Sequence, residues 1–240
     1  MKKALILTAI IFFILLSVIG GFVAWSLKNV LFNLETEEKI VALTFDDGPH
    51  PEATPALLDV LDSLDIKATF FTSGKHVALY PDILLETSQR GHEIGNHAWE
   101  HQALYHFSQE IPLKEIQETN ELIEKITGTS PTLFRPPYLV QGVGVKKILE
   151  KFSLLSVGAR VHGSDWEDQT PTVIAEKVLS SMGPGEIIVL HDGDGDAKGG
   201  ESQKSRMGSV EAVKIIGENL LKEGYQFVTI SELVKLGDKQ

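Results

Sequence analysis

The feature that most limits the possible folds is a regular alternation of strand-like and helix-like segments along most of the chain. Short runs rich in β-branched and aromatic residues predict strands, and apolar residues repeated every three or four positions predict helices between them. The expected strands are 40–45, 68–73, 92–97, 132–137, 154–161, 186–192 and 226–231, and the clearest helices are 55–64, 112–127 and 209–224. Gly91, Gly128 and Gly224 stand where helices are expected to end.

This alternation predicts an α/β fold with a parallel sheet. About seven strands in roughly 200 residues fit a small (β/α) barrel that is distorted and incomplete. The sequence contains no internal repeat and no low-complexity tract. We therefore expect one domain over residues 39–236, preceded by a short juncture at residues 28–38.

The N-terminal 27 residues differ from the rest. From Ala4 to Leu27 the chain carries no charge, and a helix of that length would span the ~30 Å hydrocarbon core of a bilayer. Lys2 and Lys3 precede this run and acidic residues follow it, which places the body outside the cytoplasm. We expect residues 1–27 to be an uncleaved signal anchor, a single-pass transmembrane helix in a bacterial cell membrane. The alternative is a cleaved signal peptide and a secreted body, but such peptides usually have a shorter apolar region.

Charge and composition exclude several classes of ligand. The formal net charge is -11 and no basic stripe is present, which argues against a nucleic-acid partner. The chain has no cysteine, so disulfides and thiolate ligands are both excluded. Any metal must therefore be bound by histidine and oxygen ligands. Nothing in the sequence indicates an obligate protein partner.

Polar residues gather where the expected strands end, which is where α/β folds place their chemistry. They are Asp46 and Asp47 after the first strand, His97 and His101 after the third, Arg135 after the fourth, Asp165 and Trp166 after the fifth, and His191 and Asp192 after the sixth. The adjacent pair Asp46–Asp47 precedes Gly48 and Pro49, so this stretch alone is compatible with a simple turn. It is also compatible with one carboxylate that binds a metal and one that transfers protons.

His97 and His101 are four positions apart, so on a helical turn they would face the same way and share one ion. One aspartate from the first strand would complete a set of two imidazoles and a carboxylate, with positions left open for water and substrate. Zinc suits this set, and cobalt, nickel and iron(II) are alternatives.

Two other patterns do not qualify as metal sites. Residues 92–97 resemble a zinc-binding HExxH motif, but Asn96 stands in place of the second histidine. Residues 192–203 resemble a calcium loop, but Ala197 and Gln203 replace its glycine and its final glutamate. We expect 192–203 to be an acidic loop close to the site and outside it.

Taken in order, the motifs resemble those of the polysaccharide deacetylases with a NodB-homology domain, carbohydrate esterase family 4, from about residue 39 to 234. The matching motifs are TFDDGP (44–49), HAWEH (97–101), RPPY (135–138), SDW (164–166) and VLH (189–191). The resemblance implies a distorted (β/α) barrel, a divalent metal, and an acetylated glycan as the substrate.

The resemblance also implies roles for individual residues. Asp47, His97 and His101 would bind the metal; Asp46, paired with Arg135, would be the general base; His191, oriented by Asp165, would be the general acid; and Tyr138, Trp166 and Val189 would contact the substrate. Physical chemistry supports this, because a cation beside one aspartate and a guanidinium beside the other would keep both carboxylates ionised. We expect His92 to be structural and His50, His76 and His106 to lie on the surface.

Three positions depart from the family pattern. Leu139 stands where the family usually has glycine, and because leucine does not comfortably adopt a positive φ, we expect a different loop there. His162 replaces an aspartate at the start of the fourth motif. Val189 replaces a leucine, which should alter the pocket only slightly.

We therefore expect a hydrolase that acts on non-peptide carbon–nitrogen bonds and removes N-acetyl groups from amino sugars. Cell-wall peptidoglycan is the expected substrate, because the anchor would hold the enzyme against the wall. Alternatives are chitooligosaccharides, O-acetyl esters of the xylan type, a formylated lipid-linked sugar, and a non-catalytic glycan-binding role. An iron(II) oxygenase also uses two histidines and a carboxylate, but strand–helix alternation disfavours it.

Overall fold

The computed structural model describes residues 12, 17, 20, 21, 30–104, 108–167, 169–195 and 205–238, without the side chain of Val143. The expected signal anchor, residues 1–27, lies outside the described residues except at four isolated positions. Within the described part of the chain, no helix is both long enough and apolar enough to cross a lipid bilayer.

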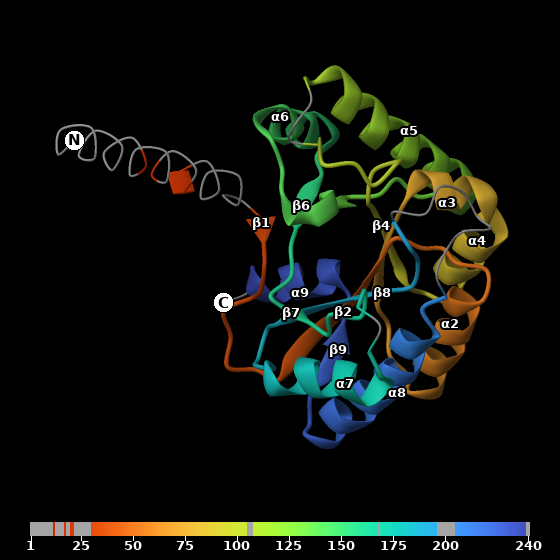
Figure 1. Cartoon of the computed structure of the whole chain (residues 1–240), viewed down its shortest axis with the longest axis vertical. Coiled ribbons are helices and arrows are strands. Elements are labelled where there is room, and N and C mark those ends of the chain that lie inside the picture. Colours follow the sequence, from red (N-terminus) through yellow and green to blue (C-terminus); the bar gives the residue numbers. More distant parts are fainter. Residues whose placement is uncertain are drawn as a thin grey trace, which may run out of the picture.

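A curled parallel sheet forms the centre of the body, with helices packed around it (Figure 1). Its strands are β1 (Val30–Leu31), β2 (Ile40–Asp46), β3 (Thr69–Thr72), β4 (Glu93–Asn96), β5 (Leu133–Phe134), β6 (Leu155–Val157), β7 (Val161–His162), β8 (Ile187–His191) and β9 (Gln226–Val228). Their spatial order is β1-β6-β5-β4-β3-β2-β8-β7, and β9 pairs with β2. The expected α/β class is confirmed, with nine strands in the described residues instead of about seven.

The helices are α2 (Ala53–Ser63), α3 (Gly74–Leu79), α4 (Pro81–Gln89), α5 (Glu110–Thr127), α6 (Val143–Phe152), α7 (Pro171–Ser180), α8 (Met207–Lys222) and α9 (Ile230–Gly237), with a short 3-10 turn η2 (Pro137–Leu139). Gly91, Gly128 and Gly224 follow α4, α5 and α8 with φ values of 81°, 75° and 87°. Their expected role at helix ends is therefore confirmed, because glycine adopts this left-handed conformation without steric cost.

The strand expected over residues 154–161 is two strands that lie in different parts of the sheet. β6 pairs with β5 and β1, whereas β7 pairs with β8. Residues 158–160 connect β6, the neighbour of the edge strand β1, to β7 at the opposite edge. The barrel is incomplete because, in the described residues, no strand pairing joins the two edge strands β1 and β7.

Both ends of the body differ from the sequence prediction. The juncture at residues 28–38 contributes β1, and Asn33 forms an isolated antiparallel bridge with Glu186. The strand expected to reach residue 231 ends at Val228, because Thr229 caps α9 in a capping box with Glu232.

The side chains of β2 point alternately to the two faces of the sheet, so they contribute to two separate parts of the core. Leu43 and Phe45 pack with α2, α7 and α8 on the outer face of the sheet. Ile40 and Ala42 belong to a separate cluster inside the curl, which α9 closes. Because side chains alternate between faces, Asp46 also points into the curl, at the carboxyl end of the sheet.

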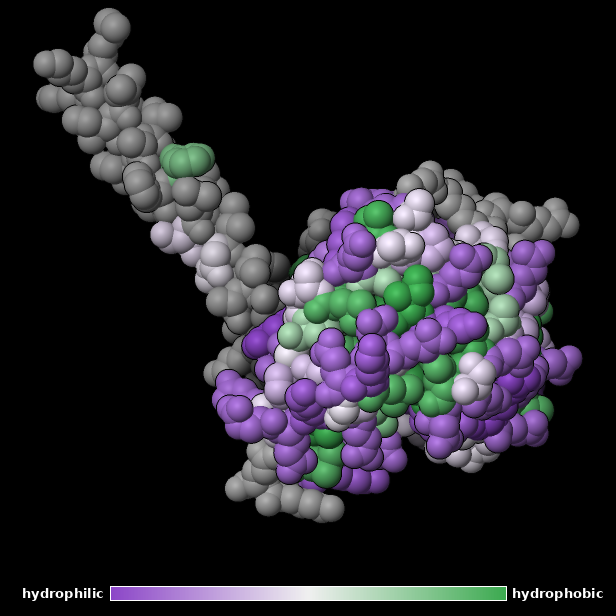
Figure 2. All heavy atoms as spheres, turned by 90° about the horizontal axis from the view of Figure 1, so that it is seen from below, coloured by the Kyte–Doolittle hydropathy of each residue, from purple (hydrophilic) through white to green (hydrophobic). Residues whose placement is uncertain are grey.

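The surface of the body carries both hydrophilic and hydrophobic residues. Seen from below, hydrophilic residues cover most of the periphery and hydrophobic residues gather toward the middle (Figure 2). Two large exposed aromatic residues, Tyr138 and Trp166, have 55% and 46% of their surface exposed. Both line the cavity described below.

Candidate active site

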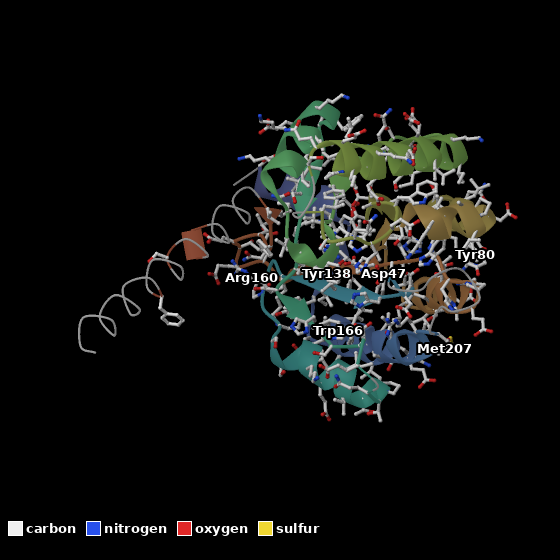
Figure 3. All side chains as sticks on the ribbon, turned by 45° about the horizontal axis from the view of Figure 1, so that its top comes forward. Asp47, Tyr80, Tyr138, Arg160, Trp166 and Met207 are labelled. Carbon is white, nitrogen blue, oxygen red and sulfur yellow. The ribbon has the colours of Figure 1, made fainter. Side chains whose placement is uncertain are left out.

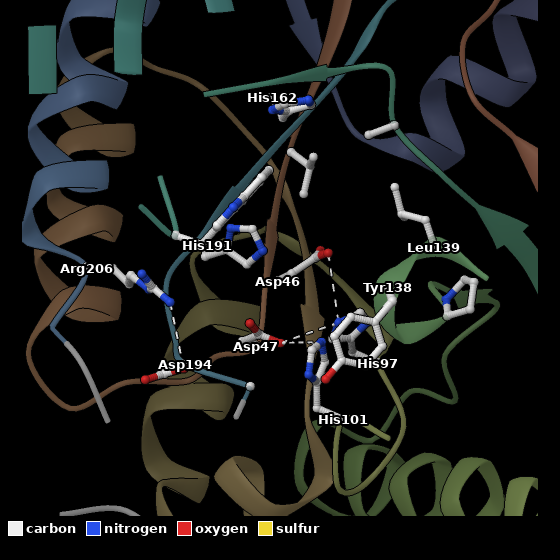
Figure 4. A pocket seen from close by; sticks show the side chains of 15 residues that line it. Asp46, Asp47, His97, His101, Tyr138, Leu139, His162, His191, Asp194 and Arg206 are labelled. Carbon is white, nitrogen blue, oxygen red and sulfur yellow. Dashed lines mark ion pairs between the residues drawn. The ribbon is translucent and has the colours of Figure 1, made fainter. Parts of the chain in front are cut away.

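A cavity of about 480 Å³ opens where β2, β4 and β8 end (Figure 4). Eight of the ten site residues predicted from the sequence line it: Asp46, Asp47, His97, His101, Tyr138, Trp166, Val189 and His191. The other two, Arg135 and Asp165, lie behind Asp46 and His191 and hold them by hydrogen bonds. Asp47, Tyr138 and Trp166 lie together near the middle of the body in Figure 3.

The adjacent carboxylates both reach the cavity because the backbone reverses at Asp47. Regular alternation would direct Asp47 away from Asp46, but Asp47 has a left-handed φ of 76°. Its N–H donates to the Phe71 carbonyl over 3.2 Å, and its own carbonyl accepts from His76 Nδ1 over 2.6 Å. Both carboxylates therefore face the same cavity.

Asp47, His97 and His101 form a cluster of metal-binding atoms. Asp47 Oδ1 lies 3.4 Å from His97 Nε2 and 3.5 Å from His101 Nε2. One ligand atom from each residue lies within 4.8 Å of the other two. Asp47 Oδ1 is buried and has no hydrogen-bond partner, which is costly unless something else pairs with it.

The orientation of His97 fits the same ligand. Its Nδ1 lies 2.7 Å from the Arg135 carbonyl, which can only accept, so this nitrogen carries the proton. When the ring is neutral, its lone pair is on Nε2, which faces Asp47. Burial alone would raise the pKa of Asp47, but interactions with His97, His101 and His191 outweigh it and hold the pKa well below its usual range. The three residues therefore fit a divalent cation that accepts nitrogen and oxygen ligands.

The helical turn expected to carry His97 and His101 is wrong. Residues 97–101 form a loop after β4, in which Ala98 and His101 have left-handed φ values of 63° and 52°. The Asn96 side chain accepts a hydrogen bond of 2.6 Å from the Ala98 N–H, and such local side-chain bonding competes with helix formation. The histidines converge because the loop reverses, and not because of helical spacing.

Arg135 fixes Asp46 from below the cavity. Its side chain is fully buried, and Nη1 donates to both Asp46 Oδ1 and Thr44 Oγ1 over 2.7 Å. Nη2 donates to the Gly158 carbonyl over 3.0 Å, and the guanidinium lies over the Phe71 ring. Asp46 Oδ2 lies 3.9 Å from His97 Nε2. One oxygen of Asp46 is thus held by the arginine while the other faces the predicted metal site.

His191 and Asp165 form a hydrogen-bonded pair on the opposite wall. His191 Nδ1 lies 2.9 Å from Asp165 Oδ1, and Asp165 Oδ2 accepts from the His191 N–H and from Ser209 Oγ. Burial lowers the pKa of His191, but the charge and hydrogen bond of Asp165 outweigh it and raise the pKa to about 9. At neutral pH this histidine is an imidazolium whose Nε2 proton is available to a ligand.

The rim of the cavity corrects another expectation. Tyr138 and Leu139 both adopt a φ of 58°, so leucine does take the conformation that we expected it to avoid. Such a conformation costs roughly 1–2 kcal/mol for a non-glycine residue. The centroid of the Tyr138 ring lies 4.7 Å from that of His101. The centroid of the Trp166 ring lies 5.2 Å from that of His162 and 5.6 Å from that of His191. Val189, which is buried, lines the cavity between these walls.

Sequence reasoning missed two buried histidines. His50 and His76 were expected on the surface, but they are 4% and 0% exposed. His50 Nδ1 accepts from two N–H groups at the start of α2, and His76 binds the Asp47 carbonyl. A single histidine in a helical pattern does not predict the contact of His76, which depends on how α3 packs against the end of β2. His106 lies outside the described residues.

The segment expected to lie outside the site contributes to it. Asp192 is buried and accepts from the Gly48 N–H over 3.2 Å and from Thr54 Oγ1 over 2.6 Å. Burial raises the pKa of Asp192 to about 7. Asp194 and Gly195 line the cavity, as does Arg206, whereas residues 196–204 lie outside the described part. The position of Asp192 directly after His191 was the sequence feature that indicated its closeness to the site.

The sequence profile of the polysaccharide deacetylases matches residues 33–156 of this chain. The chain belongs to the polysaccharide deacetylase family. A relative in this family, peptidoglycan-N-acetylmuramic acid deacetylase PdaC of Bacillus subtilis, is 36% identical over 201 residues. That alignment covers 83% of this chain and 40% of PdaC, so this chain spans about two fifths of the length of that relative.

Two further family members match over nearly their whole length. A peptidoglycan-N-acetylglucosamine deacetylase of Bacillus cereus is 35% identical over 217 residues, which cover 90% of this chain and 94% of that protein. The crystal structure of the Bc1960 peptidoglycan N-acetylglucosamine deacetylase superimposes with a TM-score of 0.78 at 31% identity. It matches 88% of this chain and 95% of the solved one. The family resemblance inferred from the five motifs is confirmed.

Proposed function

We propose that this chain is a metal-dependent hydrolase that removes N-acetyl groups from the amino sugars of cell-wall peptidoglycan. The observation that carries the proposal is the convergence of Asp47, His97 and His101 within 4.8 Å, beside Asp46 and in the same cavity as His191. The peptidoglycan deacetylases among its relatives support the choice of substrate.

Asp47, His97 and His101 would hold the metal, and zinc is the ion that two imidazoles and a carboxylate suit best. Cobalt and nickel are alternatives. When bound, such an ion supplies Lewis acidity toward a water molecule and toward the carbonyl of the acetyl group.

Asp46 is the proposed general base. Its Oδ2 is not engaged by Arg135, so it can accept the proton of the attacking water while Oδ1 stays hydrogen-bonded. The buried guanidinium places a positive charge 2.7 Å from Oδ1 of this carboxylate and fixes its orientation toward the cavity. The two adjacent aspartates thus have different roles, because Asp46 is bound by Arg135 whereas Asp47 belongs to the cluster of metal-binding atoms.

His191 is the proposed general acid. As an imidazolium it can donate its Nε2 proton to the amide nitrogen while the carbon–nitrogen bond breaks. The products are acetate and the free amine of the sugar. Asp165 keeps the Nδ1 proton in place and compensates the positive charge of the ring.

Tyr138 and Trp166 are proposed to flank the sugar, and Val189 to contact the acetyl methyl group. Exposed aromatic rings at the rim of a cavity offer the apolar surface that a sugar ring can cover. The His162 ring lies beside Trp166, tilted by 38° to it, and extends that wall.

We further propose that residues 1–27 anchor the domain in the membrane, with the active site outside the cytoplasm. This rests on the uncharged run from Ala4 to Leu27 and on the lysines that precede it. Membrane fractionation, with the mass of the mature N-terminus, tests it. A mature protein that starts near residue 27 would instead indicate a secreted enzyme.

The activity is tested with the purified full-length chain loaded with Zn²⁺, Co²⁺ or Ni²⁺. N-acetylglucosamine oligomers, purified peptidoglycan and an acetylated xylan are each supplied, and released acetate is measured. Mass spectrometry of the digested peptidoglycan shows whether glucosamine or muramic acid gains a free amine. We expect acetate from peptidoglycan and none from the Asp46→Asn variant. Bound metal without acetate from any substrate would favour a non-catalytic glycan-binding role.

A further inference from the structure

A buried carboxylate outside the cavity organises the loop that carries both histidines. Glu115, on α5, is only 8% exposed. Its Oε2 accepts hydrogen bonds from the Trp99 N–H over 2.9 Å and from the Glu100 N–H over 2.8 Å. Its Oε1 accepts from Gln102 Nε2 over 3.0 Å. One side chain therefore binds three donors of the segment between and just after His97 and His101.

This loop needs external support. It contains two left-handed non-glycine residues, Ala98 and His101, each of which costs roughly 1–2 kcal/mol. It belongs to neither a helix nor a strand, so regular hydrogen bonds do not hold it. The three N–H groups that follow His97 are instead bound by side-chain oxygens, the first by Asn96 and the next two by Glu115.

The support is anchored in rigid elements. Asn96 ends β4 and donates from Nδ2 to the Ile116 carbonyl over 2.9 Å and to Asn120 Oδ1 over 2.7 Å. On the other side, the carbonyls of Ala98 and Trp99 accept from the first N–H groups of α3. The position of α5 against β4 therefore sets the position of the loop.

We infer that Glu115 is a positioning residue that holds His97 and His101 in the geometry needed to bind the metal. The inference rests on the metal site of the proposed function. Glu115 does not line the cavity, so it acts only through the loop. Groups that orient metal ligands typically affect metal affinity by about 10- to 100-fold.

The test compares Zn²⁺ affinity, by chelator competition, in the full-length chain and its variants. Glu115→Met keeps the length of the side chain and removes both acceptors. We expect it to weaken Zn²⁺ binding by about 10- to 100-fold. In the metal-free protein, hydrogen exchange of the Trp99 and Glu100 amides should become faster. Glu115→Gln retains an acceptor oxygen and should stay close to the wild type.

The matched control is Glu118→Met, an exposed position on the same helix whose only ion pair is with Lys114 over 3.9 Å in the described residues. It should leave both Zn²⁺ affinity and amide exchange unchanged. Wild-type Zn²⁺ affinity in Glu115→Met would overturn the inference, and so would an equal loss in Glu115→Gln. If Glu115→Met does not fold, Glu115→Asp carries the test, because it withdraws the carboxylate from the loop and keeps its charge.

These outcomes separate the inference from the proposed function. Zn²⁺ binding without release of acetate from any glycan would refute the function and leave the role of Glu115 standing. Acetate release by a Glu115→Met variant with unchanged Zn²⁺ affinity would refute the role of Glu115 and leave the proposed function standing.

Discussion

His97 donates a hydrogen bond of 2.7 Å from Nδ1 to the backbone carbonyl of Arg135. The side chain of the same arginine donates to Asp46 over 2.7 Å. One residue thus orients a predicted metal ligand through its main-chain carbonyl and the predicted base through its side chain. The metal site and the base are therefore linked through β5, the strand that Arg135 follows.

Replacing His97 tests the metal cluster. His97→Ala removes one of three ligand atoms, so we expect loss of stoichiometric Zn²⁺ and of acetate release. Metal content after gel filtration measures the first effect. His162→Ala is the control for metal content, because His162 lines the cavity but is not in the cluster. Full Zn²⁺ occupancy in His97→Ala would show that this histidine is not a ligand.

Asp46→Asn separates binding from catalysis. The amide oxygen can still accept from Arg135, so the fold and the Zn²⁺ content should be retained. The base is lost, and acetate release should fall by about 10²- to 10⁴-fold. Turnover numbers on peptidoglycan, normalised to bound metal, give the comparison. A variant as fast as the wild type would assign proton transfer to another group.

Arg135→Met tests the buried ion pair. The side chain of Arg135 is fully buried and that of Asp46 is 6% exposed, so the variant leaves a carboxylate buried without its partner. We expect the free energy of unfolding to fall by about 3–5 kcal/mol in urea titrations. The double variant with Asp46→Asn should recover part of this loss. Additive losses in the double variant would mean that the two groups do not interact.

The His191–Asp165 pair predicts the alkaline side of the pH profile. Acid catalysis needs the imidazolium, whose pKa is raised to about 9, so activity should persist at neutral pH and decline as the pH rises through about 9. The raised pKa also stabilises the folded state below the ordinary value of 6.5, and this contribution is lost as the pH rises through about 9. Asp165→Asn should move the decline in kcat to lower pH. An unshifted decline would assign it to another group.

Gly195→Ala tests how closely the loop after β8 covers the cluster. A Cβ atom at this position would lie 2.5 Å from Asp47 Oδ1 and 2.6 Å from the His101 ring. We expect weaker Zn²⁺ binding, measured by chelator competition, because one of the two ligands must shift. Gly208→Ala is the control, because a Cβ atom there meets nothing closer than 3.8 Å. Equal Zn²⁺ affinity in both variants would show that the loop yields without disturbing the cluster.

The fold class and the identity of most cavity residues could be predicted from local sequence patterns. Strand–helix alternation is a local property, and in a parallel sheet it brings the carboxyl ends of strands to one edge. That is why Asp46, Asp47, His97 and His191 were predicted together. Glycines with a positive φ marked helix ends equally well, since their conformational freedom is intrinsic.

The hydrogen bonds that hold these residues could not be predicted in this way, because they depend on the packing of distant segments. Periodicity along the chain contains no information on hydrogen bonds between distant segments, such as those from α5 to the loop at 97–101 or from His76 to Asp47. Such contacts stabilise left-handed residues that local preference disfavours, including Asp47. Asp192 is likewise held by hydrogen bonds from the distant residues Gly48 and Thr54. The predicted metal ligands could therefore be identified from the sequence, whereas their geometry depends on long-range packing.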